Sequence, residues 1–298
     1  MTRNTGPGAK KEARAGLIFA SPWFIGFLVF LAYPLIASIY FSFCDYSVLK
    51  PAVFVGLDNY RELMGDELFW KTLSNTFSYA AIALPLGMVS SLILAMLLNT
   101  KVKGMPLFRT LFFIPSLVPQ VSLACLWLWV FNGEHGVLNS LLLKFGIEGP
   151  NWLGNPAWAK PALVVMAVWG GGNAMLIYLA SLQDVPTSLL EAADLDGASG
   201  WQKTLNVTLP MISPVILFNM IMGIIGSLQV FTVPYIMFPN GAPERSTYFY
   251  TSYLFDNAFR FHKMGYASAM GWIMFLMILV LTYGSLRLSS KHVHYQGG

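Results

Sequence analysis

Five residues inside the long uncharged stretches of this sequence could contact a solute. They are one aromatic ring, one glycine that permits close approach, one hydroxyl and two amides: Trp169, Gly170, Ser227, Asn173 and Gln229. Amides, hydroxyls and aromatic faces recognise neutral, hydroxyl-rich molecules, so these residues predict an uncharged solute pathway. Packing between helices, or a hydrogen bond from one helix to another, explains the same residues equally well. Both interpretations stay open.

Other kinds of chemistry leave no pattern in the sequence. There is no G-x-x-x-x-G-K-[ST] phosphate-binding loop, so this chain is not expected to bind or hydrolyse ATP itself. No G-x-S-x-G motif, no pair of carboxylates within an uncharged stretch and no cluster with metal-ligand spacing occurs. We therefore expect no catalytic residue, no metal site and no enzyme activity. Energy for transport would have to come from a partner.

The elements that must position the five candidates are membrane spans. Of the 298 residues, 56% are hydrophobic and only 11% are charged, against roughly 25% charged in soluble domains. Six uncharged stretches have twenty or more residues each: 15–44, 72–100, 110–133, 161–183, 204–243 and 264–286. A helix needs about 20 apolar residues to cross a hydrocarbon core about 30 Å thick. The sequence thus predicts an all-α integral membrane protein with six transmembrane helices.

Glycine and proline mark two of these spans. The fourth contains Gly170, Gly171 and Gly172 in succession, and each glycine in a helix interior costs about 1 kcal/mol relative to alanine. We expect a compensating gain there, such as close packing, a kink or a ligand surface. Pro115 and Pro119 interrupt the third span.

A polar amphipathic segment, Pro186–Pro214, separates the fourth and fifth spans. Ser188 and Glu191 have the spacing of a capping box, which predicts that a short helix begins at the serine. Gly197 is expected to end that helix with a positive φ. A sharp turn should follow.

A second short helix is expected after the turn. Ser199 can cap it, and it should extend through Val207. Pro210 should then hold Leu209 in an extended conformation before the next apolar stretch. The whole segment is predicted to be a helix, a turn and a helix. The simpler alternative is an amphipathic loop that rests on the bilayer.

This segment resembles the EAA loop of permease subunits in bacterial ABC importers. The matching residues are Glu191, Ala192, Ala193, Asp196, Gly197, Ala198, Leu209 and Pro210. The resemblance implies a coupling loop, residues 186–210, that faces the cytoplasm and docks on the ATP-hydrolysing subunit. Two positions depart from the pattern of carbohydrate-type members. Thr204 stands where an aromatic residue is frequent, and Gly200 stands where a basic residue is frequent.

Further segments resemble carbohydrate-type permeases of the same family. They are Phe54–Tyr60, Phe108–Arg109 with the proline pair, Pro239–Pro243 and Met264–Ala269. The resemblance implies a sugar or oligosaccharide as solute. It also implies a dimer of cytoplasmic ABC ATPases that holds ATP and Mg, a second and non-identical permease, and an extracytoplasmic solute-binding protein. No cofactor is expected on this chain, and nucleic acid is not an expected partner.

The basic residues predict the orientation in a bacterial plasma membrane. With both termini inside, the net charge is +5 on the cytoplasmic side and −1 outside, which together give the +4 of the whole chain and satisfy the positive-inside rule. We expect a basic cytoplasmic tail over residues 1–15, without regular structure through residue 14. A single six-span domain should follow over residues 16–288, and a cytoplasmic tail over 289–298.

Two other classes of membrane protein were weighed. An ion-coupled secondary transporter usually places ionisable residues within the membrane, and the six uncharged stretches contain none. A membrane scaffold would need no loop of the EAA kind. Two cysteines, Cys44 and Cys125, do not make a disulfide framework, and no bridge between them is expected. Cys125 lies in an apolar stretch, where a cysteine is usually a small apolar residue.

Overall fold

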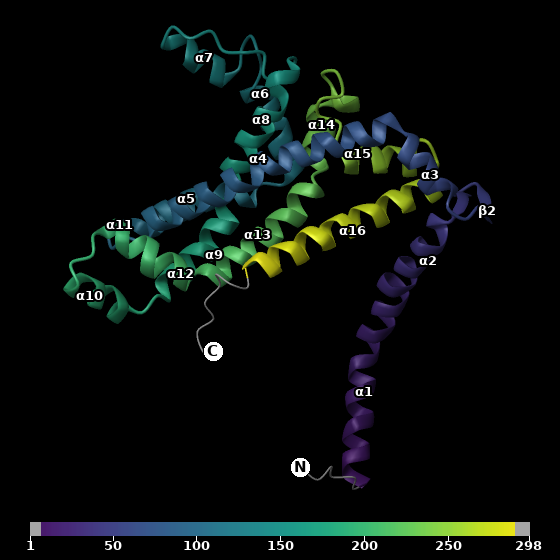
Figure 1. The fold of residues 1–298 in the computed structure, drawn as a ribbon, viewed down its shortest axis with the longest axis horizontal. Helices are drawn as coiled ribbons and strands as arrows, with labels where there is room; N and C mark the ends of the chain where they lie inside the picture. The colour runs from purple at the N-terminus through teal and green to yellow at the C-terminus, as the bar shows by residue number, and fades with distance from the viewer. Residues whose placement is uncertain (1–6, 290–298) are drawn as a thin grey trace. The chain divides into compact units, whose positions relative to one another are not determined.

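The structure is a computed structural model that describes residues 7–289, and it is mostly helical (Figure 1). The chain divides into two compact units, Met1–Gly65 with Leu254–Ile273 and Asp66–Tyr253 with Met274–Gly298. The predicted helical class is confirmed, apart from one two-stranded sheet.

The first unit begins with a long helical stretch. Helix α1 (Pro7–Phe27), a π-helical segment (Leu28–Ala32) and α2 (Tyr33–Ser42) follow one another directly. The expectation of an irregular tail is wrong from residue 7 onwards, because alanine, lysine, glutamate and arginine, which fill residues 9–15, are strong helix formers. Residues 1–6 and 290–298, which hold the rest of the predicted tails, lie outside the described residues.

A hairpin and a short helix pack at the end of α2. Strands β1 (Cys44–Ser47) and β2 (Lys50–Phe54) pair antiparallel and lead to α3 (Asp58–Gly65). The buried amide of Asn59 donates to the carbonyl oxygens of Ser42 and Cys44, both at 2.9 Å. A second π-helical segment (Asp256–Arg260) and the first part of α16 (Met264–Ser289) complete this unit.

The second unit is built around α4 (Glu67–Leu98), the blue helix of Figure 1. Asp66 caps its start by accepting from the backbone nitrogen of Leu68 at 2.8 Å. Helix α4 packs mainly against α8 (Pro156–Trp169), α9 (Gly172–Gln183) and α13 (Ser213–Leu228). This unit also contains α7 (Val137–Lys144), a 3₁₀ turn (Pro239–Gly241) and the start of α15 (Tyr250–Phe255). Its other helices are described below.

Several predicted spans are bent or broken. Helices α5 (Met105–Leu117) and α6 (Gln120–Val130) meet at 99°, and α8 and α9 meet at 41°. Among the described residues, four helices are long and apolar enough to cross a membrane, or up to six if each bent pair is one span. A further break separates α13 from α14 (Thr232–Met237) at residues 229–231.

Two buried clusters hold this unit together. One contains Trp127, Phe131, Leu163 and Phe249, and partly buried Leu138 of α7 packs on it. The other, here called the basal cluster, contains buried Ala95, Leu98, Met175, Tyr178, Leu179, Leu182, Val185 and Ile212. The basal cluster lies where α4 ends, and the polar segment that follows α9 leaves from it (Figure 1).

Candidate functional site

The polar segment contains a sharp turn centred on Gly197. Helix α10 (Thr187–Leu195) ends there, and Gly197 has φ +76°. The backbone nitrogen of Ala198 donates to the carbonyl of Ala193 at 2.9 Å, and that of Gly197 donates to Asp194 at 3.1 Å. These two bonds are a Schellman motif, which satisfies carbonyls left free at the helix end. The predicted positive φ is therefore confirmed.

The predicted capping box at Ser188 is wrong. Helix α10 begins one residue earlier, at Thr187, with Pro186 as its N-cap and no side-chain cap. Pro186 is extended, with φ −60° and ψ 126°, and proline fixes its own φ near this value. Ser188 therefore lies inside the first turn, so its hydroxyl is not placed to accept from an N-terminal amide. Glu191 is exposed and makes no capping contact.

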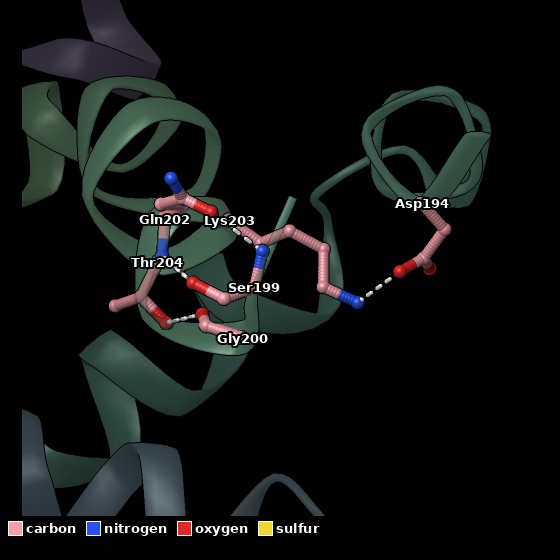
Figure 2. Close-up of polar contacts among 6 residues, drawn as sticks. All are labelled: Asp194, Ser199, Gly200, Gln202, Lys203 and Thr204. Atoms are coloured by element: carbon pink, nitrogen blue, oxygen red, sulfur yellow. Dashed lines mark hydrogen bonds and ion pairs between the residues drawn. The ribbon is translucent and has the colours of Figure 1, made fainter. Parts of the chain in front are cut away.

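The second helix, α11 (Gly200–Lys203), has the cap that the sequence predicts. The backbone nitrogen of Ser199 donates to Gln202 Oε1 at 2.7 Å, and Gln202 N donates to Ser199 Oγ at 3.4 Å, as Figure 2 shows. An ion pair joins α11 to α10, with Lys203 Nζ 2.6 Å from Asp194 Oδ1. This pair and the turn at Gly197 together set the angle between the two helices.

The two positions that depart from the carbohydrate-type pattern contact each other. Thr204 Oγ1 donates to the carbonyl oxygen of Gly200 at 3.0 Å (Figure 2). Bonding of a threonine hydroxyl to the carbonyl four residues earlier is a common arrangement within a helix.

The chain beyond α11 stays helical, so the prediction of an extended Leu209 is wrong. Residues Thr204–Thr208 form a π-helical turn and α12 (Leu209–Met211) follows, with Leu209 at φ −62° and ψ −44°. Pro210 lies in the first turn of α12, where a missing N–H is tolerated. The usual restriction on the residue before a proline is overridden because the π turn carries the helix across it.

The polar segment has one attached face and one exposed face. Leu190 and Leu209 pack against the basal cluster. Leu189, Leu195 and Trp201 are 41%, 90% and 69% exposed. These three apolar side chains are therefore accessible on the polar segment.

Four of the eight residues of the EAA pattern are exposed. Glu191, Ala192 and Asp196 are exposed and Ala193 is half-buried. Leu209 and Pro210, at the far end of the pattern, are half-buried. Glu191, Ala192 and Asp196 are thus accessible to a partner. Leu209 instead attaches the polar segment to the basal cluster.

A cavity of about 310 Å³ lies among α4, α6, α8 and the α13–α14 break. Its polar lining includes Tyr79, Gln120, Gln229 and Thr232, and no lining residue is acidic or basic. The break matters because Pro234 has no N–H to donate to the carbonyl of Val230, which leaves that helical bond unmade. Irregular backbone at membrane depth is tolerated where it lines a cavity.

Two of the five pathway candidates line this cavity, Gly170 and Gln229. Trp169 instead meets Trp127 edge-on, with ring centroids 5.6 Å apart. Ser227 Oγ donates to the carbonyl of Ile224 at 3.2 Å, within its own helix, and Asn173 is exposed outside the lining.

Sequence reasoning missed the three other polar lining residues, Tyr79, Gln120 and Thr232. Gln120 directly follows Pro119 at the start of α6. A polar residue next to a helix-breaking proline was the signal that could have found it.

The three consecutive glycines allow a kink and close helix packing, which offset their cost in a helix. Gly170 ends α8 and lines the cavity. The carbonyl of Gly171 accepts from Ser91 Oγ at 3.1 Å. A Cβ on Gly172 would lie 3.0 Å from the carbonyl oxygen of Phe112, so a larger residue would have to displace α5 from this close approach to α9. The predicted kink and close packing are both confirmed.

Comparison with known proteins gives one family over most of the chain. Residues 83–295 match the family described as binding-protein-dependent transport system inner membrane component. The chain is 40% identical to the probable ABC transporter permease protein YesP of Bacillus subtilis, over 96% of this chain and 94% of that protein. It is 35% identical to the arabinooligosaccharides transport system permease protein AraP of the same organism, over 93% and 89% of the two chains.

The fold also matches a solved structure. A chain of the bacterial alginate ABC transporter in complex with alginate pentasaccharide-bound periplasmic protein superposes with a TM-score of 0.83. The match covers 95% of this chain and 96% of that chain at 24% identity. At this identity the match shows the shared fold alone.

Proposed function

This chain belongs to the family of binding-protein-dependent transport system inner membrane components and is an ABC importer permease, and from that premise we propose that it imports a neutral sugar or oligosaccharide. The observation that carries the proposal is the cavity without charged residues. Its two amides and its tyrosine can bond hydroxyl groups, and its apolar lining can contact sugar ring faces. A relative named for arabinooligosaccharide transport agrees with this class of solute.

We place the solute contacts at Gln120, Gln229, Tyr79 and Gly170. Trp169, Asn173 and Ser227 remain proposals for the neighbouring part of the pathway. A solute entering the cavity would replace bonds to water with bonds to Gln120 and Gln229. Their amides come from α6 and from the α13–α14 break, so a movement of either element would change the fit.

The exposed face of α10 and α11 is proposed to dock on a dimer of ABC ATPases, which would hold ATP and Mg. The exposed Glu191 and Ala192, with the apolar side chains beside them, form that surface. A second, non-identical permease and an extracytoplasmic solute-binding protein complete the proposed assembly. The structural relative that was solved with a periplasmic protein supports the last of these. Both termini and the polar segment would then face the cytoplasm.

The test is uptake by the reconstituted assembly in vesicles. Gln120→Leu and Gln229→Leu should each reduce sugar uptake, since each removes a hydrogen-bonding group from the cavity. Asn219→Leu is the matched control, because the Asn219 amide bonds the Val215 carbonyl of its own helix, at 3.0 Å, and does not line the cavity. Unchanged uptake kinetics in both glutamine variants would refute the proposed solute site. Asn173→Leu tests whether the pathway extends beyond the cavity.

A further inference from the structure

Arg109 joins the ends of three helices beside the polar segment. It lies in the second turn of α5 and donates from Nε and Nη2 to the carbonyl oxygen of Leu98, at 3.2 and 2.9 Å. Leu98 is the last residue of α4, whose final carbonyls have no partner within the helix. With its amide oxygen turned towards Arg109, Gln183 accepts from Nη2 at 3.2 Å and from Nη1 at 3.3 Å.

Gln183 is the last residue of α9, three residues before the proline that starts the polar segment. One guanidinium therefore holds α4, α5 and α9 together where the proposed docking segment leaves the helices. The planar group with its several donors suits this task, because it can bond two acceptors in fixed directions at once.

The helices that Arg109 joins also reach the cavity. Helix α5 leads through the bend at Val118 and Pro119 to Gln120, and α9 leads back through Gly171 to Gly170. Along their length the two helices touch at Gly172 and Phe112. A displacement of α10 would pull directly on α9. Helix α5 packs on the basal cluster through Met105 and Phe113, and the bonds between Arg109 and Gln183 add a polar link between the basal ends of α5 and α9.

We infer that Arg109 is a positioning residue that makes α5 move with α9, so that a displacement of the docking segment reaches both sides of the solute cavity. This inference rests on the proposed function, because it assigns a route between the proposed docking surface and the proposed solute site. Arg109 itself contacts neither solute nor ATPase in this assignment.

The experiment measures solute transported per ATP hydrolysed by the whole assembly in vesicles. Arg109→Lys keeps the charge but cannot bond both acceptors in the same way. We expect its transport per ATP to fall about tenfold, the factor for losing a hydrogen bond to a charged group, while the ATPase still co-purifies. Gln183→Leu should lower the same ratio and leave the bonds to Leu98 in place. Gln183→Glu combined with Arg109→Lys should restore part of it through a charged pair.

Lys101→Gln and Lys103→Gln are the matched controls. Both lysines are exposed in the same short connection, and neither makes a hydrogen bond or ion pair with another described residue. Their ratios should equal that of the unmodified assembly.

An unchanged amount of solute transported per ATP in Arg109→Lys and Gln183→Leu would overturn the inference. The same holds if these variants lower only the amount of assembled complex and leave that ratio unchanged. Loss of the ATPase from Arg109→Lys would also overturn it, because Arg109 would then belong to the docking surface. Failure of the unmodified assembly to transport any sugar would count against the proposed function instead.

Discussion

Substitution of Gly197 should test whether the angle between α10 and α11 controls docking of the ATPase. Gly197 has φ +76°, and no atom lies within 4 Å of the place where a Cβ would stand. A side chain there meets no steric obstacle, so the whole cost is conformational. For an ordinary L-residue the left-handed conformation costs about 1–2 kcal/mol.

The loss of the native turn should increase with the cost of a positive φ for the residue that replaces Gly197. Asparagine tolerates the left-handed region, alanine less so, and a β-branched valine rarely adopts it. A cost of one or two kcal/mol changes an equilibrium by a factor of roughly 5–30. The native turn should therefore be retained in Gly197→Asn and largely lost in Gly197→Val, with Gly197→Ala between them.

Co-purification of the ATPase and sugar uptake are the assays. Gly197 lies outside every predicted span, so all three variants should reach the membrane at near-normal levels. We expect Gly197→Val to retain little ATPase and to support little uptake. Normal binding and normal uptake by Gly197→Val would refute the coupling role of this turn. Equal loss in all three variants would refute the argument from φ, since asparagine should be spared.

Four further predictions follow from the same structure. Reporter fusions at Leu195 should report a cytoplasmic location and those at Asp58 an external one; the reverse pattern would contradict the orientation. Ser199→Ala should destabilise the start of α11 by about 1 kcal/mol, seen as weaker ATPase retention, whereas equal retention would show that the cap does not matter. Gly172→Val should reduce the thermal stability of the assembly because it forces α9 away from α5, and an unchanged melting temperature would disprove close packing there. The isolated chain should hydrolyse no ATP in a phosphate-release assay.

Local features were predictable from the sequence because they depend on neighbours along the chain. The lengths of the uncharged stretches follow from the thickness of a bilayer, and the positive φ of Gly197 follows from backbone sterics at a helix end. The order and spacing of the EAA residues identified the family before any contact was known. The capping box at Ser199 is likewise local, since its two partners are three residues apart.

Some local predictions failed where two local rules competed. Ser188 and Pro186 both qualify as the residue before a helix, and the proline, which already has a fixed φ, holds that position. Leu209 precedes a proline and should be extended, but the π turn over Thr204–Thr208 continues the helix. Spacing alone does not decide such a competition, because the outcome depends on where Leu190 and Leu209 attach to the basal cluster.

The cavity and the bonds of Arg109 to the ends of α4 and α9 depend on the tertiary structure alone. Tyr79, Gln120 and Gln229 are far apart in the sequence, and nothing in their individual contexts says that they line one space. From the sequence, Arg109 is predicted only to be a basic residue at the membrane interface. Its acceptors, Leu98 and Gln183, lie 11 residues before it and 74 residues after it. Side chains from distant helices meet only after the bends at Pro119 and Gly170 have set the helix directions. Those directions depend on packing between helices that are distant in the sequence, such as α9 against α4 and α6 against α14, which no local pattern encodes.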